Sequence, residues 1–199
     1  AVKDLNNPHL AGNEQSRAKA LNQQLGPKGA NPRVDFIIDL HTTTSNMGTT
    51  LLIERQHPLY YQLAAYVKQR MPHCIIIRDE DDMAEEDNYL LCTLGRFGVI
   101  VEVGPTPQGV LKQQVFEESE QLTLVILDFI EHYNSGTLPE LPATVEAYHY
   151  VGSLKLPTND VGERTAMVHS HIDGKDFQPL NPGDPLFASF DGNVIPYKG

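Results

Sequence analysis

Apolar positions over residues 1–137 alternate between compact runs and helically spaced sets. The compact runs predict mostly buried strands, and they cover residues 34–40, 50–53, 74–77 and 99–103. The helically spaced sets predict amphipathic helices, and these cover residues 13–25, 58–71 and 113–133. Because strands alternate with helices, the pattern predicts an α/β layer structure with a largely parallel sheet.

The pattern changes after residue 137. The stretch from Asn134 to Pro142 is rich in turn residues, and beyond it short β-type pieces such as EAYHYV alternate with turns such as PGDP and FDGN. We therefore predict an α/β domain over residues 1–137 and a smaller β-rich domain over residues 138–199. The length of 199 residues is enough for one sizeable domain with a small appendage.

The formal net charge of −11 limits the partners that we expect. Nucleic acid and anionic membrane both need a basic face, so neither is predicted. No apolar run approaches the roughly 20 residues of a membrane helix, and no signal peptide is recognisable. Cys74 and Cys92 are too few for a disulfide framework, which predicts free thiols in a reducing cytoplasm. An anionic small-molecule substrate is still compatible with this net charge, because a pocket can be locally positive.

Two side chains that could take part in catalysis or metal binding lie at the ends of predicted strands. His41 comes just past one strand, and Glu102 lies near the end of the strand VIVEV. Ligands collect outside the carboxyl ends of parallel strands, so parallel strands would let both side chains face one crevice. A carboxylate inside an apolar strand is costly unless it is paired, hydrogen-bonded or near a metal.

Each residue alone also has a structural explanation. A single histidine is more often a hydrogen-bonded structural residue than a ligand, and Arg96 could satisfy Glu102 as an ion-pair partner. Together, at corresponding strand ends, they favour a metal hydrolase. In such a site His41 would be a ligand and Glu102 the base that deprotonates the attacking water.

The remaining histidines and cysteines do not complete a zinc site, which usually takes three protein ligands. The step from His9 to Glu14 does not match H-x-x-E, and the alternating pair His169 and His171 lies in the β-rich part. The two cysteines are not spaced as a zinc pair, and no G-x-S-x-G or glycine-rich phosphate loop is present.

Four motifs, in order along the chain, resemble the aspartoacylase family. The two specific ones are DLHTTTSNMG (39–48) and VEVGPTPQGVL (101–111), and the supporting ones are LNQQLGPK (21–28) and PLNPGDPLF (179–187). The resemblance implies a zinc carboxypeptidase-like α/β fold followed by a β-rich domain. It also implies that the intact protein hydrolyses N-acetyl-L-aspartate to acetate and L-aspartate with one zinc per chain.

The resemblance also implies roles for individual residues. His41 corresponds to the third zinc ligand, and Glu102 corresponds to the general base, which also lies against the substrate. Tyr89 matches a substrate-binding tyrosine of the family. The threonines after His41 are expected to line the floor of the pocket.

Departures from the family pattern are equally informative. The family's H-x-x-E zinc ligands and its D-x-D-L-N-R segment have no counterpart here, and its C-terminal tyrosine-bearing segment is also missing, so the chain looks cut at both ends. Where the family has a second substrate arginine, this chain has Cys92 or Thr93, and Arg96 comes too late. We therefore expect a looser grip on the side-chain carboxylate of acetyl-aspartate.

Rival functions stay open at this point. The closest are the related aminoacylase for aromatic N-acyl amino acids and succinylglutamate desuccinylase, which would share His41 and Glu102. A rival of another class is a non-catalytic fragment or binding domain with the same fold. Each enzymatic alternative takes a small N-acyl amino acid, and a homo-oligomer is compatible with the sequence.

Overall fold

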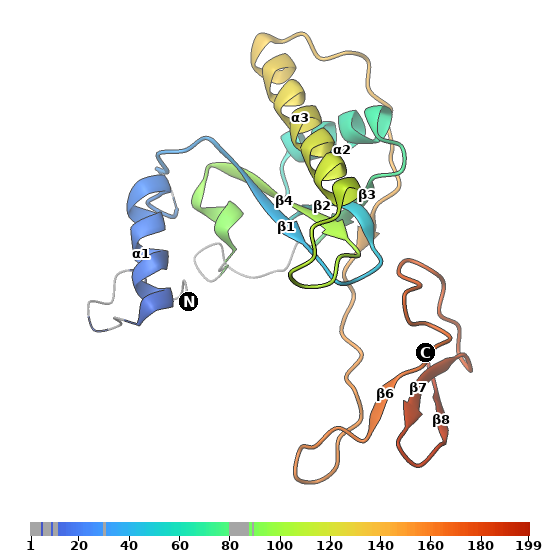
Figure 1. The fold of residues 1–199 in the computed structure, drawn as a ribbon. Helices are drawn as coiled ribbons and strands as arrows, with labels where there is room; N and C mark the ends of the chain where they lie inside the picture. Colours follow the sequence, from blue (N-terminus) through green and yellow to red (C-terminus); the bar gives the residue numbers. More distant parts are fainter. Residues whose placement is uncertain (1–4, 6–8, 10–11, 30, 80–87, 89) are drawn as a thin grey trace.

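A five-stranded sheet forms the centre of the computed structural model, which describes residues 5, 9, 12–29, 31–79, 88 and 90–199 (Figure 1). The strand order is β1-β4-β2-β3-β5. The strands are β1 (Phe36–Thr42), β2 (Gly48–Ile53), β3 (Ile75–Arg78), β4 (Phe97–Gly104) and β5 (Tyr148–His149). The pairs β1–β4, β2–β3 and β3–β5 are parallel, whereas β2–β4 is antiparallel. The predicted α/β architecture with a largely parallel sheet is confirmed.

Three α-helices occupy the predicted positions. They are α1 (Asn13–Leu25), α2 (Pro58–Arg70) and α3 (Gln113–Ser135), and a short 3₁₀ helix, η1 (Leu91–Leu94), precedes β4. Helix α2 begins at a proline, whose missing N–H is not needed there, and the His57 ring nitrogen Nδ1 accepts from the Leu59 N–H at 3.2 Å. Helix α3 ends at Gly136, which adopts a left-handed φ of 67°.

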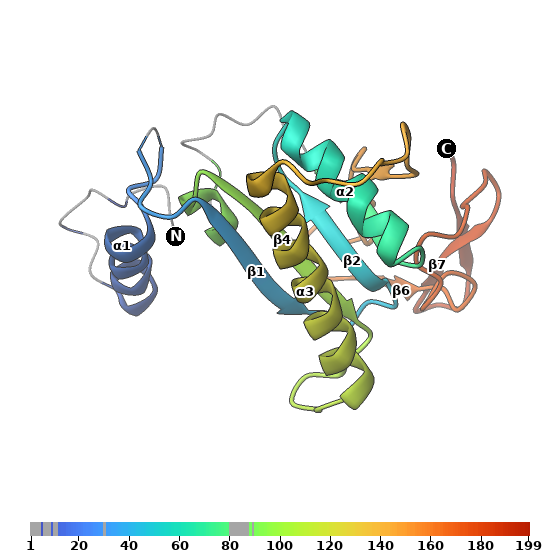
Figure 2. The ribbon, with the colours of Figure 1, turned by 90° about the horizontal axis from the view of Figure 1, so that it is seen from above.

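Helices α2 and α3 cover one face of the sheet (Figure 2). Alternate residues of a strand point to opposite faces, and the side chains that meet these helices include Leu51, Val99 and Val101. The opposite face carries a smaller apolar cluster built on Ile37, Cys92, Leu94 and Ile100, against which the α1 leucines pack. The helices therefore leave the carboxyl ends of β1 and β4 less covered on this second face.

The C-terminal part contains a three-stranded antiparallel sheet with the order β6-β7-β8. Its strands are β6 (Ala166–Val168), β7 (Pro185–Ser189) and β8 (Val194–Pro196), and they pack on their own small apolar cluster. The predicted β-piece EAYHYV behaves differently, because its β5 strand pairs with the edge strand β3 of the main sheet. The domain boundary at residue 137 stays a prediction. None of the described helices is long and apolar enough to cross a membrane.

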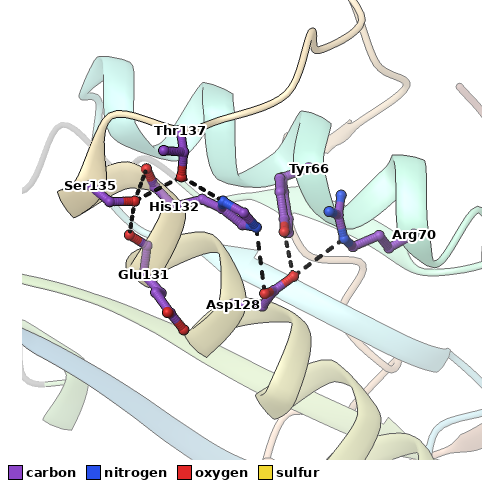
Figure 3. Close-up of polar contacts among 7 residues, drawn as sticks. All are labelled: Tyr66, Arg70, Asp128, Glu131, His132, Ser135 and Thr137. Carbon is purple, nitrogen blue, oxygen red and sulfur yellow. Dashed lines mark hydrogen bonds and ion pairs between the residues drawn. The ribbon is translucent and has the colours of Figure 1, made fainter.

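A polar cluster centred on Asp128 joins α2 to α3 (Figure 3). The fully buried Tyr66 donates its hydroxyl hydrogen to the Asp128 carboxylate. Arg70 places its Nε 3.5 Å from the same carboxylate, and its guanidinium carbon lies 3.6 Å from the centroid of the Tyr66 ring. Burial and the hydrogen bond to Asp128 together raise the pKa of Tyr66 to about 12. Asp128 is thus the acceptor that lets a buried tyrosine hydroxyl pack between two helices.

We expect Asp128→Ala to lower the free energy of unfolding by about 1–3 kcal/mol, because it leaves the buried Tyr66 hydroxyl without its acceptor. Urea unfolding followed by circular dichroism measures the change, since the chain has no tryptophan. The matched control is Glu131→Ala, which removes an exposed carboxylate from the same helix. Equal losses of stability in the two variants would contradict the assigned role of Asp128.

Candidate active site

His41 and Glu102 lie side by side near the carboxyl ends of two parallel strands. They are register partners in the β1–β4 pair, and Thr50 of β2 is the partner of Glu102 on the other side. Directly paired residues point to the same face of a sheet. Because Val101 and Val103 point into the core under α2 and α3, Glu102 and its partners point to the opposite, less covered face. The parallel arrangement that would bring both side chains to one crevice is confirmed.

Asp39 orients the imidazole of His41. The two residues are separated by one position on β1, so both side chains emerge on the same face. Nε2 of His41 lies 3.1 Å from Oδ1 of Asp39. A carboxylate on one ring nitrogen fixes the tautomer and the ring orientation, and Nδ1 is then the nitrogen that suits a ligand role. The D-x-H spacing on a strand carried this signal, although no role for Asp39 was predicted from the sequence.

Glu102 has the properties of a proton acceptor. Partial burial raises the pKa of its carboxyl above the usual 4.5, the positive potential of His41 opposes this shift, and the charge of Asp39 adds to it. A carboxyl with a raised pKa holds a proton more firmly than an exposed one, which suits general-base chemistry. Arg96 does not neutralise it, because the Nε of Arg96 lies 3.7 Å from Oδ1 of Asp35, at the amino ends of the same strands.

The loop after His41 packs directly on the end of β4. The Thr43 N–H donates to the Val103 carbonyl at 3.1 Å, and the Thr106 N–H donates to the Thr43 carbonyl at 2.8 Å. A Cβ atom on Gly104 would lie only 2.6 Å from the Ser45 carbonyl oxygen and 2.7 Å from the Thr43 carbonyl oxygen. Glycine is therefore required at position 104, because the backbone of residues 43–45 approaches the end of β4 so closely.

A groove of about 930 Å³ opens beside these strand ends. One wall consists of Thr44, Ser45 and Asn46 after β1, together with Pro105 after β4. The other wall comes from the C-terminal part, within residues 168–180. Thr44 is thus the one of the three threonines after His41 that lines this groove. His41 and Glu102 are not among its lining residues, and the groove adjoins them through residues 44–46 and 105, which follow the two strands.

The remaining predicted residues take different positions. Tyr89 lies outside the described residues, so its substrate-binding role stays a prediction. Cys92 and Thr93 are buried in η1, with 1% and 2% of their surface exposed. Burial, reinforced by the charges of Glu54 and Asp39, raises the pKa of the Cys92 thiol to about 12. Both cysteines are free, and Cys92 is an inert core residue on the site's side of the sheet.

The described residues supply an incomplete set of metal ligands. Within the ranges that the structure describes, no group of three or more His, Cys, Asp or Glu side chains is arranged to hold a metal ion. His41 has the chemistry of a zinc ligand, with Asp39 as the carboxylate behind it. His169 lies in the C-terminal part, where its Nδ1 accepts from the His171 N–H at 3.0 Å. The residues present therefore fit part of a zinc site.

Comparison with known families gives two adjoining matches. The model described as "Succinylglutamate desuccinylase/Aspartoacylase catalytic domain" matches residues 2–130. The model described as "AstE/AspA barrel-sandwich hybrid domain" matches residues 143–199. The first match contains His41 and Glu102, and the second contains the C-terminal wall of the groove.

Individual relatives support the same assignment. The chain is 42% identical over 190 residues to the aspartoacylase of Danio rerio and 38% identical over 188 residues to the human N-acyl-aromatic-L-amino acid amidohydrolase (carboxylate-forming). Each match covers 94% of this chain, but only 59% and 58% of the respective relative. The chain thus spans less than two thirds of the length of these relatives.

A solved structure shows the same fold. The crystal structure of murine aminoacylase 3 matches with a TM-score of 0.87 and 35% identity, over 96% of this chain and 63% of that one. The predicted fold class, a zinc carboxypeptidase-like layered sheet followed by a smaller β-rich part, is confirmed by this match. The family models, the relatives and the fold agree: this chain belongs to the succinylglutamate desuccinylase/aspartoacylase family.

Proposed function

We propose that this chain carries the His41–Glu102 half of the active site of an N-acyl amino acid amidohydrolase. The observation that carries the proposal is the register pairing of His41 with Glu102 on the less covered face of the sheet. Asp39 behind the imidazole and the raised pKa of Glu102 are the features that catalysis would need. A purely structural histidine would not require a partly buried carboxylate beside it.

The chemistry is the hydrolysis of a linear amide bond. Glu102 takes a proton from the attacking water, whose oxygen bonds to the acyl carbon. The bond between the acyl carbon and the nitrogen then breaks, and Glu102 returns the proton to the leaving amine. The second proton of the water is lost as the acid becomes a carboxylate, and the amine takes it up. The products are a carboxylate and an amino acid with an ammonium group, so atoms and charge balance without any further reactant.

We also propose that the protein is a zinc enzyme with one zinc per chain. His41 would provide one ligand through Nδ1, and the two other ligands would come from sequence beyond this chain, in the part of the relatives that it does not match. When bound, zinc supplies Lewis-acid polarisation of the acyl oxygen and of the water. Within the chain itself, Asp39 orients the ligand and Glu102 moves the proton.

N-acetyl-L-aspartate is the proposed substrate, with aromatic N-acyl amino acids as the second candidate. The relatives do not decide between them, because 42% and 38% identity differ little. The motifs DLHTTTSNMG (39–48) and VEVGPTPQGVL (101–111), which resemble aspartoacylases, put the acidic substrate first. The charge of the groove does not decide, because Lys175 and His171 share its wall with Asp173 and Asp176. None of its described lining residues is Phe, Tyr or Trp. An aromatic acyl amino acid would find few planar apolar partners there.

The proposed location is the cytoplasm. Both cysteines are free, which is ordinary in a reducing compartment. A homo-oligomer stays a prediction. If the protein instead is a non-catalytic binding domain, it will hold the substrate without turning it over.

Glu102→Gln tests the catalytic assignment. In the intact enzyme we expect turnover of N-acetyl-L-aspartate to fall by about 10²–10⁴, the usual cost of removing a general base. The matched control is Asp35→Asn, which removes an exposed carboxylate near the other end of β1 and should leave turnover unchanged. If Glu102→Gln keeps normal turnover per folded molecule, Glu102 has a structural role only.

Cys92→Arg tests substrate choice. Position 92 lies on the site's side of the sheet, near Asp39, but its side chain is only 1% exposed. The new guanidinium therefore adds the cation that the family provides in this region only if η1 rearranges to let it reach the site. We expect a lower KM for N-acetyl-L-aspartate and little change for N-acetyl-L-phenylalanine, the sign of a ground-state contact. Cys92→Met, similar in reach and uncharged, is the control, and thermal unfolding reports whether the buried substitution is tolerated. A wild-type enzyme that ignores N-acetyl-L-aspartate would put the aromatic substrate ahead.

A further inference from the structure

Residues 174–177 form a contact segment between the C-terminal part and the main sheet. The Asp176 carboxylate accepts the Asn46 backbone N–H at 3.0 Å, and the Gly174 carbonyl accepts the Asn46 side-chain amide at 2.5 Å. The Phe177 ring lies 4.7 Å from the Tyr148 ring, centroid to centroid. Asn46 is 130 residues from Asp176 in sequence, so these contacts are tertiary and join two parts of the fold.

The backbone of this contact segment is specifically shaped. Gly174 has a φ of 68°, and Phe177 has a φ of 61°, which is unfavourable for a residue with a side chain. Phe177 is the one non-glycine residue with a left-handed φ in the described part of the chain. Its ring packs against the ring of Tyr148 of β5, and the preceding residue, Asp176, accepts from Asn46. An unfavourable φ persists where surrounding contacts determine it.

The contact segment binds the loop that follows His41, residues 43–47. On its inner side the loop is tied to β4 through Thr43, which donates to Val103 and accepts from Thr106. On its outer side the hydrogen bonds run from Asn46 to Asp176 and Gly174. The loop is therefore held from both sides, and Thr44, between these attachment points, lines the groove.

We propose that Asp176 is a positioning residue for the active site, acting through Asn46. By holding the Asn46 N–H, its carboxylate fixes residues 43–46 in one conformation and keeps the groove wall at one distance from His41 and Glu102. The C-terminal part thus contributes to the reaction by setting this geometry, without touching the reacting atoms. This inference rests on the proposed function of the His41–Glu102 pair.

Amide hydrogen exchange on the 199-residue chain tests the mechanical part without any activity. We expect Asp176→Ala to speed exchange at residues 43–47 by about tenfold or more, because local opening becomes easier, while β4 keeps its protection. Asp176→Asn keeps an acceptor oxygen and should exchange like the wild type. The control is Asp160→Ala, an exposed carboxylate elsewhere in the C-terminal part. Unchanged exchange at residues 43–47 in Asp176→Ala overturns the proposal.

Steady-state kinetics on the intact enzyme test the catalytic part. We expect Asp176→Ala to lower kcat by about 10-fold to 100-fold, the order expected for a misplacement of about 1 Å in an active site. Asp176→Asn should recover most of this loss, and the thermal midpoints of both variants should stay close to that of the wild type. Faster exchange with unchanged kcat, or a kcat loss that only follows unfolding, overturns the positioning role. If the wild type has no hydrolase activity, the proposed function is wrong. Hydrogen exchange then still decides whether Asp176 holds the loop.

Discussion

The parallel pairing of β1 with β4 is the constraint on which the rest of the site depends. In this register His41 meets Glu102, and a shift by one residue would turn one of the two side chains into the core beneath α2 and α3. Val101 and Val103, the neighbours of Glu102 on β4, are fully or almost fully buried under those helices. The packing of the core on one face of the sheet thus determines which side chains lie on the other face, where the site is.

The same pairing explains the residues that follow each strand. The loop that follows His41 packs against the end of β4 so closely that only glycine fits at position 104. The C-terminal part contacts the other side of this loop, where the Asp176 carboxylate accepts from the Asn46 N–H. The groove beside the pair is therefore built from three separate stretches of sequence, and its described lining has no aromatic side chain.

The sequence was sufficient for the parts of the structure that depend on local patterns. Apolar runs located the four main-sheet strands up to β4 within a few residues, because burial on both faces demands such runs. Glu102 was recognisable because a carboxylate inside an apolar strand is costly to bury, and His41 because it comes just past the end of a strand, where ligands collect. The antiparallel entry of β2 and the addition of β5 to β3 were not predictable in this way, since both depend on contacts between distant segments.

Side-chain contacts were the least accessible part of the site. Asp39 could have been found, because D-x-H on a strand places both side chains on one face. The Asp176–Asn46 bond had no local signal, since the two residues are 130 positions apart. Cys92 illustrates the opposite case: the sequence places it where the family binds substrate, whereas its side chain is only 1% exposed and lies among apolar neighbours.

Zinc binding by the intact protein tests the account most directly, because it asks whether the β1–β4 pairing presents a ligand. Equilibrium dialysis with metal analysis should find one zinc per chain in the wild type, and His41→Ala should lower the affinity sharply. The 199-residue chain alone should bind zinc weakly, since it offers one of the three protein ligands that a catalytic zinc usually takes. Tight, stoichiometric zinc on this chain alone, or an intact His41→Ala variant that keeps its zinc, would contradict the assignment of His41.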